Sequence, residues 1–189
     1  MTDIPWEPPL AGTETEHLLG ALDRMRTTFR WKADGLDAAA LNAKVGQSSL
    51  TLGGLLKHLA LIEDHTMAAK ILGVPLTGWD DLDPNDDDAE FTSAAGDEPE
   101  ALYARYDDAV ARFRTNLAAA LADGGLDRPS AAVWPDGSTF SLRRVLFDHL
   151  EEYGRHCGQA DILRDAIDGR AGEDPPADWR PTSGHYTFR

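Results

Sequence analysis

The chain has 189 residues, of which 33 are acidic and 18 basic, and its formal net charge is -15. This balance argues against nucleic acids and anionic membranes as partners, since both attract basic surfaces. The single cysteine, Cys157, excludes an internal disulfide and a cysteine-based zinc site. We expect one globular domain over residues 1–189. We also expect it to be cytoplasmic, because no signal peptide precedes the first helix and no run reaches the roughly 18 apolar residues of a membrane span.

Apolar residues at helical spacing predict four amphipathic helices. In chain order they cover about residues 12–33, 50–72, 98–124 and 139–169. Ser48, Ser49 and Thr51 are candidate N-caps of the second helix, and Gly73 ends it. Gly169 ends the fourth helix. The pattern predicts an all-α four-helix bundle, whose core is a recurrent place for metal sites.

The connections between these helices differ in kind. Residues 36–47 form a moderate loop, whereas residues 73–97 form a long acidic loop between the second and third helices. The long loop carries Trp79 and Phe91, so we expect it to cover a pocket. A short hairpin is predicted around the turn at residues 135–137. The C-terminal tail, residues 170–189, is predicted to be irregular, with three packing anchors: Trp179, Tyr186 and Phe188.

Glu152 and His156 lie four residues apart in the fourth helix, on one face and roughly 6 Å apart along its axis. Both can therefore reach one divalent ion, and His58 of the second helix could add a third ligand across the core. Two histidines and one glutamate are typical of a catalytic zinc. The spacing leaves His149 open in place of His156, and His65 in place of His58. Residues seven apart are separated by about 10.5 Å along a helix, so both members of such a pair cannot easily bind the same ion.

Two segments resemble the recurring elements of the DinB/YfiT-like superfamily, and of its actinobacterial DinB-type group in particular. They are EEYGRHCGQADILR at residues 151–164 and TLGGLLKHL at residues 51–59. With the helix order, the resemblance covers nearly the whole chain. It implies a four-helix bundle that holds a divalent metal by one residue of the second helix and two of the fourth. Many members use three histidines, and this chain has Glu152 instead, like the mycothiol-dependent maleylpyruvate isomerase branch. The implied ligands are His58, Glu152 and His156.

The resemblance also implies a metal-dependent thiol S-transferase, isomerase or hydrolase that acts on a small electrophile. Its cosubstrate would be a low-molecular-weight thiol such as mycothiol, and its metal zinc, with nickel or another divalent ion as the alternative. His65 and His149 are candidates to move a proton or orient the substrate. Gln159 is either a helix-surface residue or a partner of a ligand, and Cys157 is expected to pack rather than react.

A function of a different class stays open beside the enzyme. The chain could be a non-catalytic, metal-stabilised helical bundle that binds a ligand or a protein partner. The sequence does not identify the electrophile of the enzyme, and both hypotheses allow a homodimer. Turnover by the purified protein is the observation that separates them.

Overall fold

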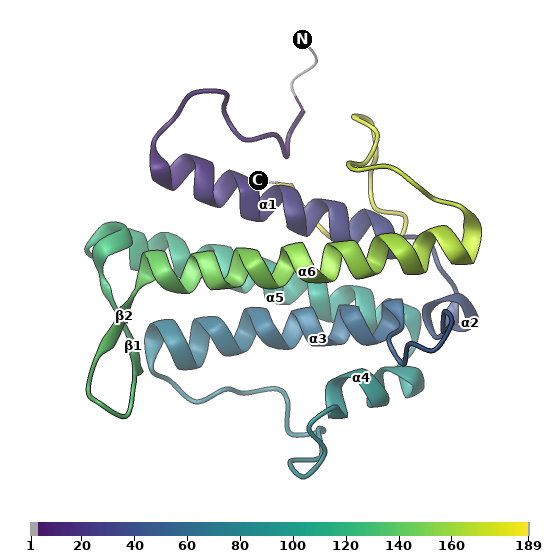
Figure 1. Cartoon of the computed structure of the whole chain (residues 1–189), viewed down its shortest axis with the longest axis horizontal. Helices are drawn as coiled ribbons and strands as arrows, with labels where there is room; N and C mark the ends of the chain where they lie inside the picture. Colours follow the sequence, from purple (N-terminus) through teal and green to yellow (C-terminus); the bar gives the residue numbers. More distant parts are fainter. Residues whose placement is uncertain (1–3, 189) are drawn as a thin grey trace.

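The computed structural model describes residues 4–188 of the chain. It is mainly helical, and four long helices lie side by side (Figure 1). They are α1 (Glu14–Ala33), α3 (Leu52–His65), α5 (Pro99–Ala122) and α6 (Leu142–Asp168). Helix α1 packs along α6, α3 packs along α5, and α3 also contacts α6. The mainly helical class expected from the sequence is confirmed, and the arrangement is compatible with an all-α bundle.

Capping residues fix the ends of these helices close to the predicted positions. Thr13 begins α1 in a capping box with Glu16: its hydroxyl accepts from the Glu16 N–H at 3.3 Å, and the Glu16 carboxylate accepts from the Thr13 N–H at 2.7 Å. Among the three candidates for α3, Thr51 is the N-cap. Ser141 caps α6, and Gly169 ends it in the left-handed region with a φ of 78°.

The segment that follows α3 differs from the sequence prediction in two ways. The predicted helix over residues 50–72 begins as α3, but it continues as a π-helix, η1 (Thr66–Leu72). The acidic connection of residues 73–97 contains a short helix that the sequence did not predict, α4 (Ala89–Ser93), followed by the 3-10 turn η2 (Ala94–Gly96). Because α4 packs against α3, this connection returns to the bundle surface.

Shorter elements complete the connections. A four-residue helix, α2 (Ala38–Leu41), lies within the loop between α1 and α3. A 3-10 turn, η3 (Gly125–Asp127), and a hairpin join α5 to α6. The hairpin strands β1 (Pro129–Val133) and β2 (Thr139–Ser141) pair antiparallel, as predicted around residues 135–137. Strand β1 also lies against η1, which holds the hairpin at one end of the helices.

Apolar side chains from all four long helices form the core. Those buried most completely include Leu22, Phe29, Leu55, Leu59, Tyr106, Phe113, Leu146 and Tyr153. The C-terminal tail crosses α1 and α5, where the His185 N–H donates to Asp107 at 2.8 Å. Tyr186 is buried and Trp179 and Phe188 are half-buried, so the three predicted anchors of the tail do pack.

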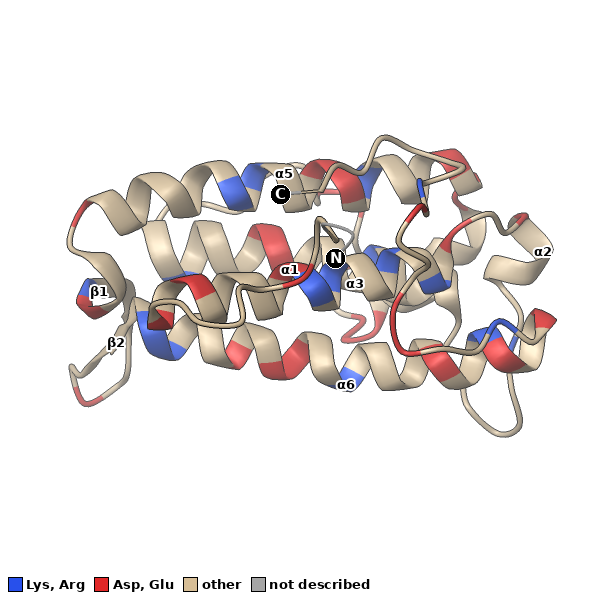
Figure 2. Ribbon diagram, turned by 90° about the horizontal axis from the view of Figure 1, so that it is seen from above, with Lys and Arg blue, Asp and Glu red and all other residues tan. Residues whose placement is uncertain are grey.

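Charged residues of both signs follow one another along the long helices (Figure 2). Several are paired at the surface, as Arg143 is with Glu14 at 2.9 Å and Arg144 with Asp148 at 2.6 Å. Within residues 4–188, none of the helices combines the length and apolar character that crossing a membrane requires.

Candidate metal centre

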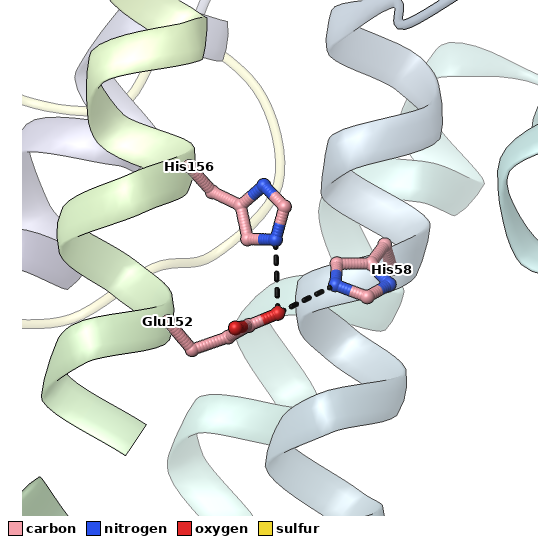
Figure 3. A group of neighbouring side chains, drawn as sticks. All are labelled: His58, Glu152 and His156. Atoms are coloured by element: carbon pink, nitrogen blue, oxygen red, sulfur yellow. Dashed lines mark hydrogen bonds and ion pairs between the residues drawn. The ribbon is translucent and has the colours of Figure 1, made fainter. Parts of the chain in front are cut away.

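Three side chains from two helices converge at one point in the structure (Figure 3). His58 comes from α3, and Glu152 and His156 come from successive turns of α6. The Glu152 Oε1 atom lies 3.2 Å from His58 Nε2 and 3.0 Å from His156 Nε2. The three ligand atoms all lie within 4.8 Å of one another. The structure therefore brings together the three residues implied by the resemblance.

The spacing of these atoms fits a divalent ion. Two ligand atoms that lie 2.0–2.2 Å from a tetrahedral zinc ion are roughly 3.3–3.6 Å apart. The observed separations of 3.0 and 3.2 Å from Glu152 Oε1 need only a small outward movement of the side chains to reach this range. His58 and His156 are buried, while Glu152 is partly exposed, so solvent approaches from the side of the carboxylate.

Each histidine is held from behind by an oxygen atom. His58 Nδ1 lies 3.0 Å from Oε1 of Glu90, and His156 Nδ1 lies 2.6 Å from Oε1 of Gln159. An ionised carboxylate can only accept a hydrogen bond, so Glu90 places the proton of a neutral His58 ring on Nδ1. The lone pair of Nε2 then faces Glu152, which is the arrangement that a metal ligand requires.

Glu152 itself is in the charged form that a cation needs. Burial opposes its ionisation, but the neighbouring imidazoles of His58 and His156 outweigh burial and hold the pKa of this carboxyl below its ordinary value. Phe91 of α4 stacks on the His58 ring with a centroid distance of 4.4 Å. The site is therefore charged through the carboxylate of Glu152, and the Phe91 ring forms an apolar wall on one side of it.

A cavity of about 380 Å³ adjoins Glu152 between α3, η1 and α6. Most of its lining side chains are polar or charged, and the set comprises Ile62, Thr66, Lys70, Arg144, Val145, Asp148, His149, Glu151, Glu152 and Arg155. Glu152 is the residue of the candidate centre that forms part of its wall.

The alternative histidines lie elsewhere. His149 is buried, stacks on Phe113 with a centroid distance of 4.8 Å, and has its Nε2 3.2 Å from Glu63 Oε2. It borders the cavity without joining the cluster. His65 is exposed near the end of α3, and burial and nearby Lys70 lower the pKa of its imidazole. Neither histidine belongs to the metal-binding group that the described residues form.

Cys157 neighbours His156 in sequence but faces a different part of the molecule. Its thiol donates to the backbone oxygen of Met25 at 3.3 Å. Burial raises the pKa of this thiol to about 12, so it is protonated at neutral pH. These contacts agree with the packing role expected from the sequence.

A buried polar network lies directly behind His149, and the sequence analysis missed it. Arg26 donates two hydrogen bonds of 2.6 Å to Glu63, and the Tyr153 hydroxyl donates a third, also of 2.6 Å. Burial raises the pKa of Glu63, but Arg26 and His149 outweigh burial and lower it to about 2. The available signal was that Arg26 and Glu63 each stand among the apolar residues of a predicted helix. A buried charge needs a partner, so the two could have been expected to pair.

Glu90 was also missed as a functional residue, although the aromatic neighbour Phe91 was expected to cover a pocket. The signal was weak, since Glu90 stands among many acidic residues of the segment 73–97. Gln159, which the sequence left undecided, contacts His156 directly.

Comparison with protein-family models gives a match. The model described as Mycothiol-S-transferase matches residues 17–169, a span that contains all three residues of the centre. Comparisons with curated proteins and with solved structures give no match.

Proposed function

Because the chain belongs to the mycothiol-S-transferase family, a DinB/YfiT-like family, we propose that it transfers the sulfur of a low-molecular-weight thiol to a small electrophile. The thiol is mycothiol or a close relative. His58, Glu152 and His156 would hold the divalent metal ion for this reaction in a DinB-like four-helix bundle. The observation that carries this proposal is the convergence of two Nε2 atoms on one carboxylate oxygen, at 3.0 and 3.2 Å.

Zinc is the proposed metal, because two histidines and a carboxylate with open positions form a typical catalytic zinc set. When bound, such a cation stabilises the thiolate form of the cosubstrate, which is the nucleophile. Glu90 and Gln159 orient the two imidazoles, and the partly exposed Glu152 leaves the approach from the polar cavity open. Phe91 keeps water from the opposite side of His58.

Of the two histidines considered for proton transfer, His149 is the better placed. It borders the cavity that leads to Glu152, and the buried Glu63 carboxylate lies behind its ring at 3.2 Å. A carboxylate in that position is a group that orients the imidazole of a general base. We propose that His149 accepts the proton released by the thiol. His65 borders a different cavity and lacks such a partner among the contacts of the described residues.

The proposal is tested by metal content and turnover together. Protein purified without a nickel column should contain about one divalent ion per chain by elemental analysis. With mycothiol and chloroacetamide, the metal-loaded protein should form the thioether and release chloride. The variant His156→Ala should lose ~100-fold or more of this rate, because a metal ligand is removed. His17→Ala, which changes an exposed histidine, is the matched control. Equal rates in the two variants would favour the non-catalytic binding module.

A further inference from the structure

A second cavity, of about 460 Å³, lies on the other side of Ile62 from the cavity beside Glu152. Ile62 forms part of both walls, since it lines the first cavity as well as the second. The segment between η1 and α4, the acidic connection that the sequence predicted to cover a pocket, forms one wall of the second cavity. Its volume is within the range of about 300–1,000 Å³ that small-molecule sites occupy.

This second cavity is lined by a residue that contacts the candidate metal centre. Glu90, whose carboxylate lies 3.0 Å from His58 Nδ1, is part of its wall. Leu61 and Ile62 also line it, and they follow His58 on α3 by three and four residues. On a helix those positions lie one turn beyond His58 on nearly the same face. A ligand in the cavity therefore lies one helical turn from a residue of the centre.

The two cavities differ in chemistry. The first is lined mainly by charged and polar groups, including Arg144 and Asp148. The second has an apolar wall, which is formed by Leu61, Ile62, Leu76, Trp79 and Leu82. Its acidic residues, Asp83, Asp86 and Glu90, all belong to the acidic segment, and His65 of α3 also lines it. Such an apolar wall favours a hydrocarbon group, which it removes from water.

Contacts with neighbouring residues hold the Trp79 side chain in place in this apolar wall. Its indole N–H donates to Asp64 at 3.1 Å, and the Arg105 guanidinium lies over its ring at 4.6 Å from the centroid. The side chain is 8% exposed, so most of the ring is already packed. A preformed aromatic surface of this kind costs little ordering free energy when a ring-bearing ligand binds.

We propose that this second cavity is the binding site for the electrophile, and that the electrophile carries an apolar, ring-bearing group. The inference rests on the proposed function, in which the thiol approaches through the polar cavity on the other side of Ile62. For an alkyl halide, the thiolate sulfur forms a bond to the carbon while the carbon–halogen bond breaks. The halide leaves with the electron pair, and the proton of the thiol passes to His149.

The first test compares two electrophiles with the same reactive carbon, chloroacetamide and N-benzylchloroacetamide, each with mycothiol. The wild type should show the higher kcat/KM for the benzyl compound. Leu82→Asp places a charge in the apolar wall, so it should lower the ratio of the two kcat/KM values by about 10-fold or more. Leu10→Asp makes the same change at a leucine that is 91% exposed and should leave the ratio as it is. A ratio that Leu82→Asp does not change would overturn the inference.

The second test measures binding without turnover. N-benzylacetamide lacks the leaving group, and calorimetry should detect its binding to the metal-loaded protein, weakened about 10-fold by Leu82→Asp. Absence of binding, or binding that Leu82→Asp does not affect, would overturn the cavity assignment. Binding that persists without turnover of either chloroacetamide would instead contradict the proposed transferase and support the cavity. The two failures are therefore distinguishable.

Discussion

Each histidine of the candidate centre depends on a residue outside the cluster for its orientation. His58 is held between the Glu90 carboxylate and the ring of Phe91, both from α4. His156 is held by Gln159 on its own helix. An oxygen atom that accepts the hydrogen bond from Nδ1 fixes the orientation of the ring. It also makes the lone pair of Nε2 a stronger ligand for a cation. The affinity of the centre should therefore respond to residues that would never touch the ion.

Replacement of Glu90 by alanine tests this dependence. We expect Glu90→Ala to weaken metal affinity by about 10- to 100-fold while His58, Glu152 and His156 stay in place. Competition with a chromophoric chelator measures the affinity. Asp87→Ala removes an exposed carboxylate from the same acidic segment and should have little effect. If both variants bind the metal as the wild type does, packing against Phe91 alone is enough to orient His58.

At the level of whole elements, α4 can approach His58 closely because the first turn of α3 contains a glycine, Gly54. A Cβ atom on Gly54 would lie 3.2 Å from the backbone oxygen of Phe91 and 3.4 Å from its Cα atom. The backbone of α4 thus rests where a side chain of α3 would otherwise be. Since Glu90 and Phe91 both belong to α4, this close approach places the two residues that hold His58.

Substitution of Gly54 by valine should displace α4 and imitate the loss of Glu90. We expect Gly54→Val to weaken metal affinity by roughly 10-fold, at the lower end of the effect of losing an orienting residue. The double variant Gly54→Val, Glu90→Ala should bind no more weakly than Glu90→Ala alone, because both changes remove one contact. Gly158→Val on α6, where a Cβ atom meets open space, is the control. Fully additive losses would show that Gly54 acts on the centre by another route.

The contrast between α6 and α4 shows which parts of the structure the sequence could predict. Helix α6 extends over many turns, so its apolar stripe and its end at Gly169 were visible, and so was the local pair Glu152 and His156. Helix α4 has five residues, too few for a helical period to appear. Its position depends on contact with α3, which is not local in sequence.

The choice of His58 over His65 also depends on tertiary structure. Spacing within α3 allowed either residue, and only the alignment of α3 against α6 brings His58 to Glu152. Before the structure, only the resemblance to a family indicated that His58 is the residue that lies beside Glu152. Likewise, the partners of Glu63 come from α1 and α6, and nothing within α3 points to them.

Across the whole molecule, all four long helices contribute side chains to a buried polar centre. Arg26 belongs to α1, Glu63 to α3, Tyr106 to α5 and Tyr153 to α6. Glu63 accepts from Arg26 and Tyr153, and the hydroxyls of Tyr153 and Tyr106 lie 3.0 Å apart. Because an unpaired charge in this place would be costly, the network favours one arrangement of the four helices. It also holds His149 at the edge of the polar cavity.

Because of this network, the free energy of unfolding should depend on pH over a defined acidic range. The pKa of Glu63 is about 2 in the folded protein, against an ordinary value of 4.5. A lowered folded pKa means that the stabilisation is complete above pH 4.5 and is lost as the pH falls from there toward 2. With about 1.4 kcal/mol per pKa unit, Glu63 should contribute about 3 kcal/mol to the free energy of unfolding at neutral pH.

Glu63→Gln should remove this acid dependence. At pH 7 the variant should be less stable by about 3–5 kcal/mol, because the buried Arg26 guanidinium loses its two charge-assisted hydrogen bonds to Glu63. Between pH 5 and pH 2, however, its unfolding free energy should fall by about 3 kcal/mol less than that of the wild type. Urea unfolding followed by circular dichroism, with a chelator present so that metal release does not add its own pH dependence, measures both quantities. Asp87→Asn, at an exposed carboxyl, should follow the wild-type curve. If Glu63→Gln also ran parallel to the wild type, Glu63 would not be the group that links folding to acid.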